Sequence, residues 1–558
     1  AGGADLAFIV ANADVDRVSF SSDGDSVGRV IITDEPPAPI GIQIDSDDPV
    51  RKIIDKRRAG GADLAFIVAN ADVDRVVLRE SLTGFDLDDV LLRGDVLLPD
   101  DIDRDGSRGN PTAFYARGEV GRFQSRGDVA GSIVSDEGMF RVDVRGELTG
   151  GNITIGPDLQ QGSARLRLGD LERVQIRSEL PLVDLRAEEY TGGSGSLVEA
   201  PALRSLKVTG GRGGDGDFDA SLVLNDPDAD FSLQRATIRG GIIGGSWELA
   251  SALGILNVKG DVNGFSLSST GDTRLLRAGE ITNSTFTIDG VVAQVRAESH
   301  RGGSITVRSL GVAKFTGGRD NPGDFSAELF VVDQTIDTRA FFVRGDLDDA
   351  QVRIQNPVGR ISVRGDVRDS DLLFGATRNL RLNSVTDSNI EALGADGVRD
   401  FRAHEVLGGS ISGAFERINI TGDRRSGAEG HLTADLNLNR PDRVFINGDF
   451  EGTMTLVSAG TVFIRGDVRP QSAINARPIN FGGIGLRSLF VEGAYRDSTF
   501  RTNTSMDTVD VGSAVDSRFN FGVNSSPDRF GNANQYNPFF FVNSITIGRT
   551  GQPDGFVN

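Results

Sequence analysis

Several residue types are scarce or missing in this sequence of 558 residues. Cysteine is absent, which excludes disulfides and any metal or cluster held by cysteine thiolates. Histidine occurs only three times, at His300, His404 and His431, and the spacing of these residues does not match a metal site. We therefore expect all three histidines to be polar surface or turn residues.

Long hydrophobic runs and positive charge are also scarce. No segment approaches the roughly 20 consecutive apolar residues that a membrane-spanning helix needs, so no membrane span is expected. The 59 Lys and Arg residues are outnumbered by 80 Asp and Glu residues, which gives a net charge of −21. Nucleic acids and anionic membranes would meet a repulsive field, and we expect neither as a partner. The opening Ala1-Gly2-Gly3 lacks a basic and apolar leader, which favours a processed mature chain.

What the sequence does contain is one pattern that recurs along most of its length. Two apolar residues alternate with other residues, a Gly follows, often after Arg, and then comes Asp or Glu. Examples are the segments 142–147, 256–261, 361–366 and 462–467. The glycines recur at intervals of 18 to 20 residues, as from Gly448 to Gly466 and from Gly345 to Gly365. A fixed period of this length without helical periodicity predicts stacked β coils.

The alternation also predicts which side chains face inward. Residues four and two positions before the Gly, such as Ile361 and Val363, are apolar and are expected in the core, with the intervening residues outside. We expect the Gly to supply a positive φ at a corner and the following Asp to cap its own turn. A second strand is expected in each period, for example at 284–288 and 304–307.

These Val-Arg-Gly-Asp-Val periods resemble the parallel β-helices of large bacterial surface proteins, adhesins and extracellular fibres. The resemblance covers most of the chain after about residue 77. The strict hexapeptide of left-handed β-helices is missing, so the sequence favours an all-β, right-handed parallel β-helix, or β-solenoid, with coils of about 19 residues. The resemblance implies an extracellular or cell-surface location and a structural role.

The two ends of the chain depart from the period. Residues 1–18 recur without change at 59–76, although the residues that come after each copy differ. Prolines between the copies indicate an extended linker. We therefore predict an extended N-terminal arm over 1–58, a solenoid body over 59–510, and a cap or assembly segment over 511–558 that is rich in Asn and Phe.

The duplicated segment has two explanations. A strand that is identical to another can take its place in a second molecule, which would make the arm a donor strand for assembly. A recent duplication or an artefact of the sequence explains the identity equally well.

Aspartates at alternate positions are candidate Ca²⁺ ligands. The first series precedes Gly106 and resembles the first half of an EF-hand-type loop, but Thr112 stands where that loop has a bidentate Glu. Two further series lack the Gly, and solvated acidic loops are the alternative in each case. The candidate metal ligands are Asp101, Asp103, Asp105, Asp215, Asp217, Asp219, Asp226, Asp228 and Asp230.

Phenylalanines recur at one outward position, three residues before the Gly. An outward aromatic column is costly in water unless something covers it, so it indicates a lateral interface or an overlying loop, with a local bulge toward the core as the alternative. Together with the duplicated segment and the C-terminal phenylalanines, these residues form the predicted assembly interface. It comprises Ala7, Phe8, Ile9, Val10, Phe66, Ile67, Val68, Phe445, Phe463, Phe490, Phe539, Phe540 and Phe541.

Two further motifs have structural explanations. Arg-Gly-Asp occurs five times, but always in register with the repeat, so we expect an outward Arg ladder beside a ladder of corner carboxylates and not receptor ligands. Acidic pairs in neighbouring coils resemble the carboxylates of a glycosidase or lyase cleft, but acids recur in these turns for structural reasons. Those residues are Asp348, Asp349, Asp369 and Asp371.

The sequence therefore predicts an extracellular or cell-surface structural protein and not an enzyme, with no catalytic residues. We expect self-assembly into a fibre or surface layer, helped by strand exchange of the N-terminal arm and by Ca²⁺. Another copy of the chain is then the main partner, with cell-surface polysaccharide as a second one. A polysaccharide-binding or polysaccharide-cleaving β-helix is the alternative, and a viral or phage-like fibre is a third reading.

Overall fold

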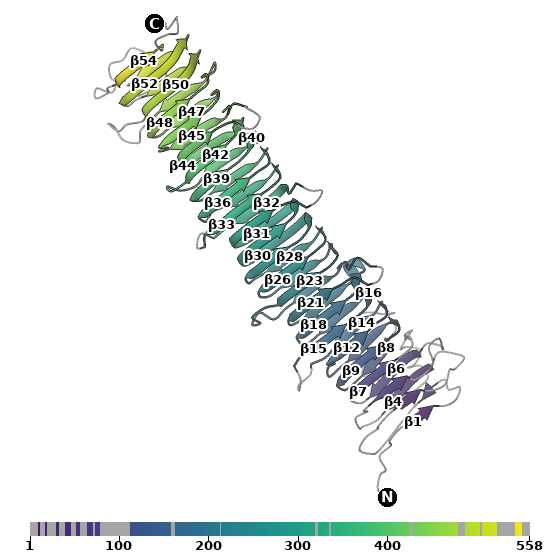
Figure 1. The fold of residues 1–558 in the computed structure, drawn as a ribbon. Helices are drawn as coiled ribbons and strands as arrows, with labels where there is room; N and C mark the ends of the chain where they lie inside the picture. The colour runs from purple at the N-terminus through teal and green to yellow at the C-terminus, as the bar shows by residue number, and fades with distance from the viewer. Residues whose placement is uncertain are drawn as a thin grey trace. The chain divides into compact units, whose positions relative to one another are not determined.

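The structure of the protein is a computed structural model. The structure describes residues 9–11, 17–18, 30–32, 40–45, 52–55, 64–70, 73–78, 112–157, 162–211, 214–318, 322–333, 336–423, 428–477, 486–502, 505–521 and 542–548. The chain divides into two compact units, Ala1–Gly290 and Val291–Asn558. Within each unit the described strands stack in parallel as the coils of a β-solenoid (Figure 1). The predicted all-β solenoid is thus confirmed, whereas the sense of its coiling stays a prediction.

A complete coil contains three strands, although the short middle strand is reduced to a single bridge in some coils. In the second unit, one coil consists of β36 (Val358–Val363), the short β37 (Val367–Arg368) and β38 (Asp371–Phe374). These strands pair in parallel with β39 (Thr377–Arg381), β40 (Ser384–Thr386) and β41 (Asn389–Ala392) of the following coil. The expectation of two strands per period was therefore incomplete. We call the three resulting sheets first, second and third, in chain order.

The first unit contains a complete set of these sheets. Its first sheet consists of β1 (Ile9–Ala11), β3 (Val30–Ile32), β5 (Ile53–Asp55), β7 (Val73–Leu78), β9 (Val120–Ser125), β12 (Arg141–Val144), β15 (Ala164–Arg167), β18 (Leu182–Ala187), β21 (Leu203–Val208), β23 (Leu233–Ile238), β26 (Leu253–Val258) and β29 (Thr273–Arg277). The second consists of β10 (Val129–Ala130), β13 (Leu148–Thr149), β16 (Asp170–Glu172), β19 (Glu189–Thr191), β24 (Ile242–Ile243), β27 (Val262–Asn263) and part of β30 (Glu280–Ala297). The third consists of β2 (Arg17–Val18), β4 (Ile40–Asp45), β6 (Leu64–Asn70), β8 (Thr112–Ala116), β11 (Ser132–Ser135), β14 (Asn152–Ile155), β17 (Gln175–Ser178), β20 (Leu197–Ala200), β22 (Ser221–Leu224), β25 (Ser246–Leu249), β28 (Ser266–Ser269) and part of β30. One 3-10 turn, η1 (Gly193–Gly195), interrupts the strands.

The second unit repeats this arrangement. Besides β36 and β39, its first sheet contains parts of β31 (Ser299–Phe315) and β44 (Ser410–Ile420), and β33 (Thr338–Val343), β42 (Val398–Ala403), β46 (Arg443–Ile446), β48 (Ala459–Ile464), β50 (Leu486–Arg496), β52 (Met506–Val515) and β54 (Val542–Ile547). Its second sheet also contains β34 (Leu347–Asp348) and β43 (Glu405–Leu407). Its third sheet also contains β32 (Phe325–Val331), β35 (Gln351–Ile354), β45 (Asp435–Asn439), β47 (Thr453–Leu456), β49 (Ala473–Ala476), β51 (Thr499–Thr502) and β53 (Arg518–Phe521).

The cores follow the alternation of apolar residues. In β26, Leu256 and Val258 are buried, whereas Asn257 between them is partly exposed. Because the strands pair in register, equivalent residues form columns along the stack. In addition, five aromatic rings from non-equivalent positions of successive coils pack on one another in the core of the first unit, with neighbouring centroids 5.3–5.9 Å apart, and we call them the aromatic column. It contains Tyr190, Phe218, Trp247, Phe265 and Phe286.

One of the histidines belongs to the core of the second unit. His300 is fully buried and packs on Phe315 and Phe325. The expected surface position of His300 was therefore wrong. His300 pairs with Phe325 in the inward column of the second sheet. The strands of this sheet are too short to show an alternation of apolar residues in the sequence. His431 is partly exposed, in line with the expected surface or turn position, and its Nδ1 accepts a hydrogen bond of 3.2 Å from the Asp449 amide.

The first corner of each coil lies between the first and second sheets. Close packing between coils explains the Gly at this corner. Gly365 does not have a positive φ, contrary to expectation. A Cβ atom at this position would lie 2.4 Å from the carbonyl carbon of Gly345 and 2.1 Å from Oδ1 of Asp346, both in the preceding coil. Only a residue without a side chain fits between these atoms.

The Asp after that Gly caps a turn in the next coil and not its own, which corrects the second expectation for this corner. Asp346 Oδ1 accepts a hydrogen bond of 2.8 Å from the Asp366 amide, and Asp324 accepts one of 3.0 Å from the Asp346 amide. The same contact recurs in both units, with Asp128, Asp217, Asp261, Asp449 and Asp467 as acceptors. A column of aspartates thus connects successive coils through their backbones.

The corner between the second and third sheets uses serine. Asp369 has a φ of 48° there, a conformation that Asp and Asn tolerate better than most residues. The following Ser370 donates a hydrogen bond of 2.6 Å to the Arg368 carbonyl and accepts one of 3.1 Å from the Ala350 amide. Ser388 in the next coil accepts a hydrogen bond from the Ser370 amide. Both corners therefore satisfy backbone groups across coils.

Asp449 shows how charge contributes to the aspartate column. Its carboxylate accepts hydrogen bonds of 2.7 Å from the Asp467 amide and 2.8 Å from Nε of Arg469. Burial alone raises the pKa of Asp449, but these hydrogen bonds and the positive charge of Arg469 outweigh it and lower the pKa below its usual value. A carboxylate whose pKa is lowered in the folded state stabilises the fold at pH values above its ordinary pKa. This contribution is lost as the pH falls through the lowered pKa.

Replacing Asp449 with alanine is therefore expected to destabilise the neighbouring coils by about 1–3 kcal/mol at neutral pH, because the Asp467 amide loses its acceptor. Hydrogen exchange of β46, β48 and β50 at several pH values measures the effect. The matched control is Asp442→Ala, which removes an exposed carboxylate from the same coil. Acidification should lower the stability of the wild-type coils toward that of the Asp449→Ala variant. If the stability of the variant depended on pH as strongly as that of the wild type, the assignment would be contradicted.

Candidate functional site

Three phenylalanines form a column on the outer side of the first sheet in the second unit. β46, β48 and β50 pair in parallel, which places Phe445 beside Phe463 and Phe463 beside Phe490. Each of these residues is partly exposed, whereas their neighbours along the strands are buried. The register of the strands therefore creates an outward aromatic surface, which we call the phenylalanine face. Its predicted role in assembly stays a prediction.

The rings of the phenylalanine face are not evenly stacked. Phe445 and Phe463 lie nearly parallel, with centroids 5.6 Å apart and an angle of 18° between the rings. Phe463 and Phe490 are 6.2 Å apart and tilted by 38°. The guanidinium of Arg443 lies over the Phe445 ring, 5.3 Å from its centroid, and covers that end of the column. The column therefore opens toward Phe490.

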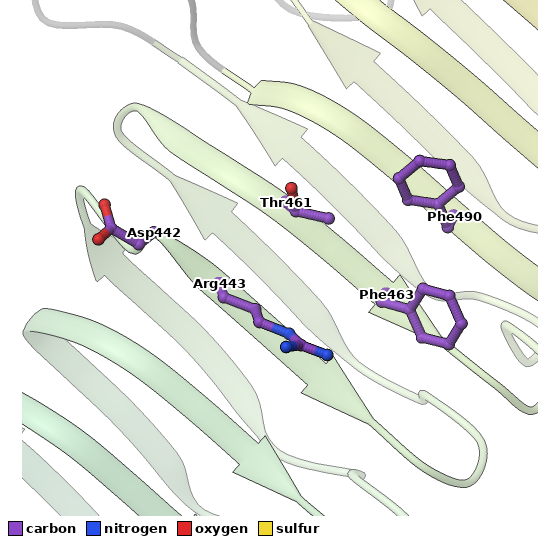
Figure 2. A pocket seen from close by; sticks show the side chains of 5 residues that line it. All are labelled: Asp442, Arg443, Thr461, Phe463 and Phe490. Atoms are coloured by element: carbon purple, nitrogen blue, oxygen red, sulfur yellow. The ribbon is translucent and has the colours of Figure 1, made fainter.

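A pocket of about 330 Å³ lies where the column opens. Figure 2 shows the side chains that line it, which project from the neighbouring strands β46, β48 and β50 and from the residue before β46. These are Asp442, Arg443, Thr461, Phe463 and Phe490. The pocket thus combines two aromatic rings, a hydroxyl group and one charge of each sign.

The two charged residues of the pocket differ from others nearby. Within the described residues, neither the Asp442 carboxylate nor the Arg443 guanidinium has an ion-pair partner. Arg465, by contrast, donates a hydrogen bond of 2.9 Å to Asn447 and lies 3.5 Å from the Glu492 carboxylate. Asp442 and Arg443 therefore keep hydrogen-bonding capacity that neighbouring residues use within the fold.

Other outward phenylalanines are covered by arginine. The guanidinium of Arg364 lies 5.2 Å from the Phe342 ring centroid, and that of Arg353 lies 5.8 Å from Phe330. Sequence reasoning missed these pairs, although an arginine 22 or 23 residues after each phenylalanine was a usable signal. Cation–π contact thus reduces the cost of exposing an aromatic ring on these sheets.

The aspartate series are only partly described. Asp101, Asp103 and Asp105 lie outside the described residues. In the other two series, Asp217 accepts a hydrogen bond from the Gly241 amide, and Asp226 accepts one from the Asp228 amide. The described residues contain no group of three or more acidic or histidine side chains that could hold a metal ion. Calcium binding stays a prediction.

The acidic residues that resembled a cleft have structural positions. Asp349 and Asp369 have φ values of 49° and 48° at equivalent corners, and Asp371 accepts a hydrogen bond from the Asn389 side chain. The Arg-Gly-Asp tripeptides that begin at Arg126, Arg344 and Arg465 contribute their aspartates to the capping column. Arg93 lies outside the described residues. The absence of enzymatic activity stays a prediction.

The two copies of the duplicated segment occupy different sheets. Residues 9–11 form β1, which pairs with β3 in the first sheet. The identical residues 67–69 belong to β6, which lies between β4 and β8 in the third sheet. Ala7, Phe8 and the phenylalanines 539–541 lie outside the described residues. One sequence therefore has strand partners in two sheets, which the sequence alone did not indicate.

The described residues thus offer two features for recognition, the phenylalanine face with its pocket and the duplicated strand. No helix in this part of the chain is long and apolar enough to cross a membrane. Comparison of the chain with protein-family models, with curated proteins and with solved structures found no match.

Proposed function

We propose that this chain is an extracellular structural protein that assembles with copies of itself by exchanging the duplicated strand. The observation that carries the proposal is that identical residues pair in two different sheets. The second copy lies within the stack, with β6 between β4 and β8 and β7 between β5 and β9. The first copy of another molecule has the same sequence as the second copy and therefore matches the site that the second copy occupies.

Burial supports this interpretation. Ile67, Val73 and Val76 are fully buried in the second copy. The same side chains stand at positions 9, 15 and 18 of the first copy. Full burial of one such side chain contributes about 1.5–3 kcal/mol. A first copy from another molecule therefore recovers the apolar burial that the displaced second copy loses.

The residues directly after the identical block limit the exchange. β7 continues to the fully buried Leu78, where the first copy has Phe20. Placing a larger side chain in a filled core costs roughly 1–3 kcal/mol. The second copy also has the advantage of being attached to its own site, which gives it a high effective concentration. Exchange is therefore expected to increase with protein concentration.

The duplication provides a matched pair of variants. Ile9→Asp is expected to abolish concentration-dependent assembly and leave the fold intact, because only the donor copy changes. Ile67→Asp is expected to destabilise the first unit, because it places a charge in the core. Analytical ultracentrifugation measures the first effect, and circular dichroism with hydrogen exchange measures the second. Assembly of Ile9→Asp at the wild-type level would contradict the proposal.

The absence of cysteine permits a direct test of where the donor strand lies. Val68 pairs with Gln43, so exchange places Val10 of one molecule opposite Gln43 of another. Within one molecule, Val10 pairs with Ile31. A mixture of Val10→Cys and Gln43→Cys proteins should form a disulfide-linked dimer on oxidation. A mixture of Val10→Cys and Ile31→Cys proteins is the control; equal crosslinking in both mixtures would exclude specific exchange.

A further inference from the structure

We infer that the pocket of the phenylalanine face binds a neutral saccharide. This inference is independent of strand exchange, because the pocket and the duplicated segment belong to different units. The first argument is size and composition. A volume of about 330 Å³ lies at the lower end of the range for ligand pockets, which combine an apolar wall with a few placed polar groups.

The apolar wall consists of Phe463 and Phe490. The distance of 6.2 Å and the tilt of 38° between their rings leave more aromatic surface open than the nearly parallel pair of Phe445 and Phe463. Figure 2 shows both rings beside each other at the end of the pocket opposite Asp442. Sugar rings present an apolar surface of C–H groups, which can pack against such a wall, so the site suits a ligand that is apolar on one side.

The polar groups favour neither sign of charge. Asp442 and Arg443 carry opposite charges, so a ligand with a net charge gains no net attraction from the pair; the net charge of −21 adds a barrier for anions. Both side chains are exposed, and neither has an ion-pair partner within the described part of the chain. The carboxylate accepts hydrogen bonds, the guanidinium donates them, and the Thr461 hydroxyl does both. A ligand whose hydroxyl groups both donate and accept matches this set.

A second hydroxyl group lies along the first sheet from the pocket. Thr461 pairs with Ser488 and Ser488 with Thr508; Ser488 is buried, whereas Thr508 is partly exposed. We therefore expect a neutral oligosaccharide to bind more tightly than a monosaccharide.

Isothermal titration calorimetry of the full chain with glucose, maltohexaose, cellohexaose and N-acetylchitohexaose tests the inference, with polygalacturonate as the anionic comparison. At least one neutral hexasaccharide is expected to bind saturably and more tightly than glucose. Phe463→Ala and Phe490→Ala are expected to weaken it about tenfold, the loss of roughly one aromatic contact. Asp442→Asn and Arg443→Gln change exposed residues and should weaken binding while hydrogen exchange shows that β46, β48 and β50 stay folded.

The matched control is Phe342→Ala, because Phe342 also projects from a first-sheet strand beneath an arginine but lies outside the pocket. It should leave saccharide binding unchanged, as should Ile9→Asp, which tests strand exchange alone. No saturable binding by any neutral hexasaccharide, stronger binding of polygalacturonate, or equal binding by all the variants would overturn the inference. Loss of self-association in Phe463→Ala without saccharide binding would instead identify the face as a contact between copies and would also overturn it.

Discussion

Trp247→Ala is expected to destabilise the first unit by about 3–5 kcal/mol, the range for removing a large aromatic side chain from a core. Trp247 is fully buried, and its ring lies between Phe218 and Phe265 with centroid distances of 5.6 and 5.3 Å. Both contacts are edge-to-face, at an angle of 88°. The substitution breaks the aromatic column in its middle and leaves a cavity that neighbouring coils fill only in part.

Trp247→Phe is the control for this prediction. Nε1 of Trp247 has no hydrogen-bond partner among the described residues, so the replacement loses no hydrogen bond and keeps an aromatic ring in the column. We expect it to cost clearly less than the alanine variant. A solenoid can unfold in parts, so hydrogen exchange of β22, β25 and β28 is a better measure than a single melting temperature. A cost below about 1 kcal/mol for Trp247→Ala would contradict the role of the column.

Gly365→Ala is expected to destabilise the second unit by about 3 kcal/mol, at or above the upper part of the range for overpacking. The added Cβ would lie 2.4 Å from a backbone carbon of Gly345, and backbone cannot rotate away as a side chain can. The substitution therefore has to separate two coils at the first corner. That movement also weakens the hydrogen bond from the Asp366 amide to Asp346.

Two comparisons isolate the steric cause. Gly195→Ala adds a Cβ that meets nothing within 4 Å, and such a change often stabilises a protein by about 0.4–1 kcal/mol through the unfolded state. Asp346→Ala removes the nearest side-chain oxygen, but the backbone contact remains, so combining it with Gly365→Ala should not restore stability. Hydrogen exchange of β33 and β36 provides the measurement. Rescue by the second substitution would show that the carboxylate, and not the backbone, excludes alanine.

The sequence was sufficient to predict features that repeat along the stack. Coils of similar length place like residues in columns, so the position of Leu256 in the core and of Phe463 outside follows from the alternation alone. The second sheet was missed because two or three residues are too few to show a period. The reason for Gly365 was missed because it depends on atoms of the preceding coil and not on the local turn.

The pocket lay further from what a sequence can show. The phenylalanine column followed from register, but its opening depends on the tilt of the Phe490 ring. The hydrogen-bonding capacity of Asp442 and Arg443 is available because neither has an ion-pair partner within the described residues. A sequence motif does not show whether a side chain has such a partner. The two identical segments pair in different sheets, so the residues around each segment, and not the segment itself, determine its strand partners.

The aspartate column gives the stack a direction. Where the column is present, each Asp completes the turn of the coil that comes after it, so the coil of Asp346 receives a cap from Asp324 and provides one to Asp366. A coil that is inserted or removed as a whole leaves this exchange intact, whereas a change of a few residues interrupts it. The length of such a chain can therefore change in steps of one coil, because an added Gly-Asp coil accepts its cap from the coil before it and provides the cap for the coil after it.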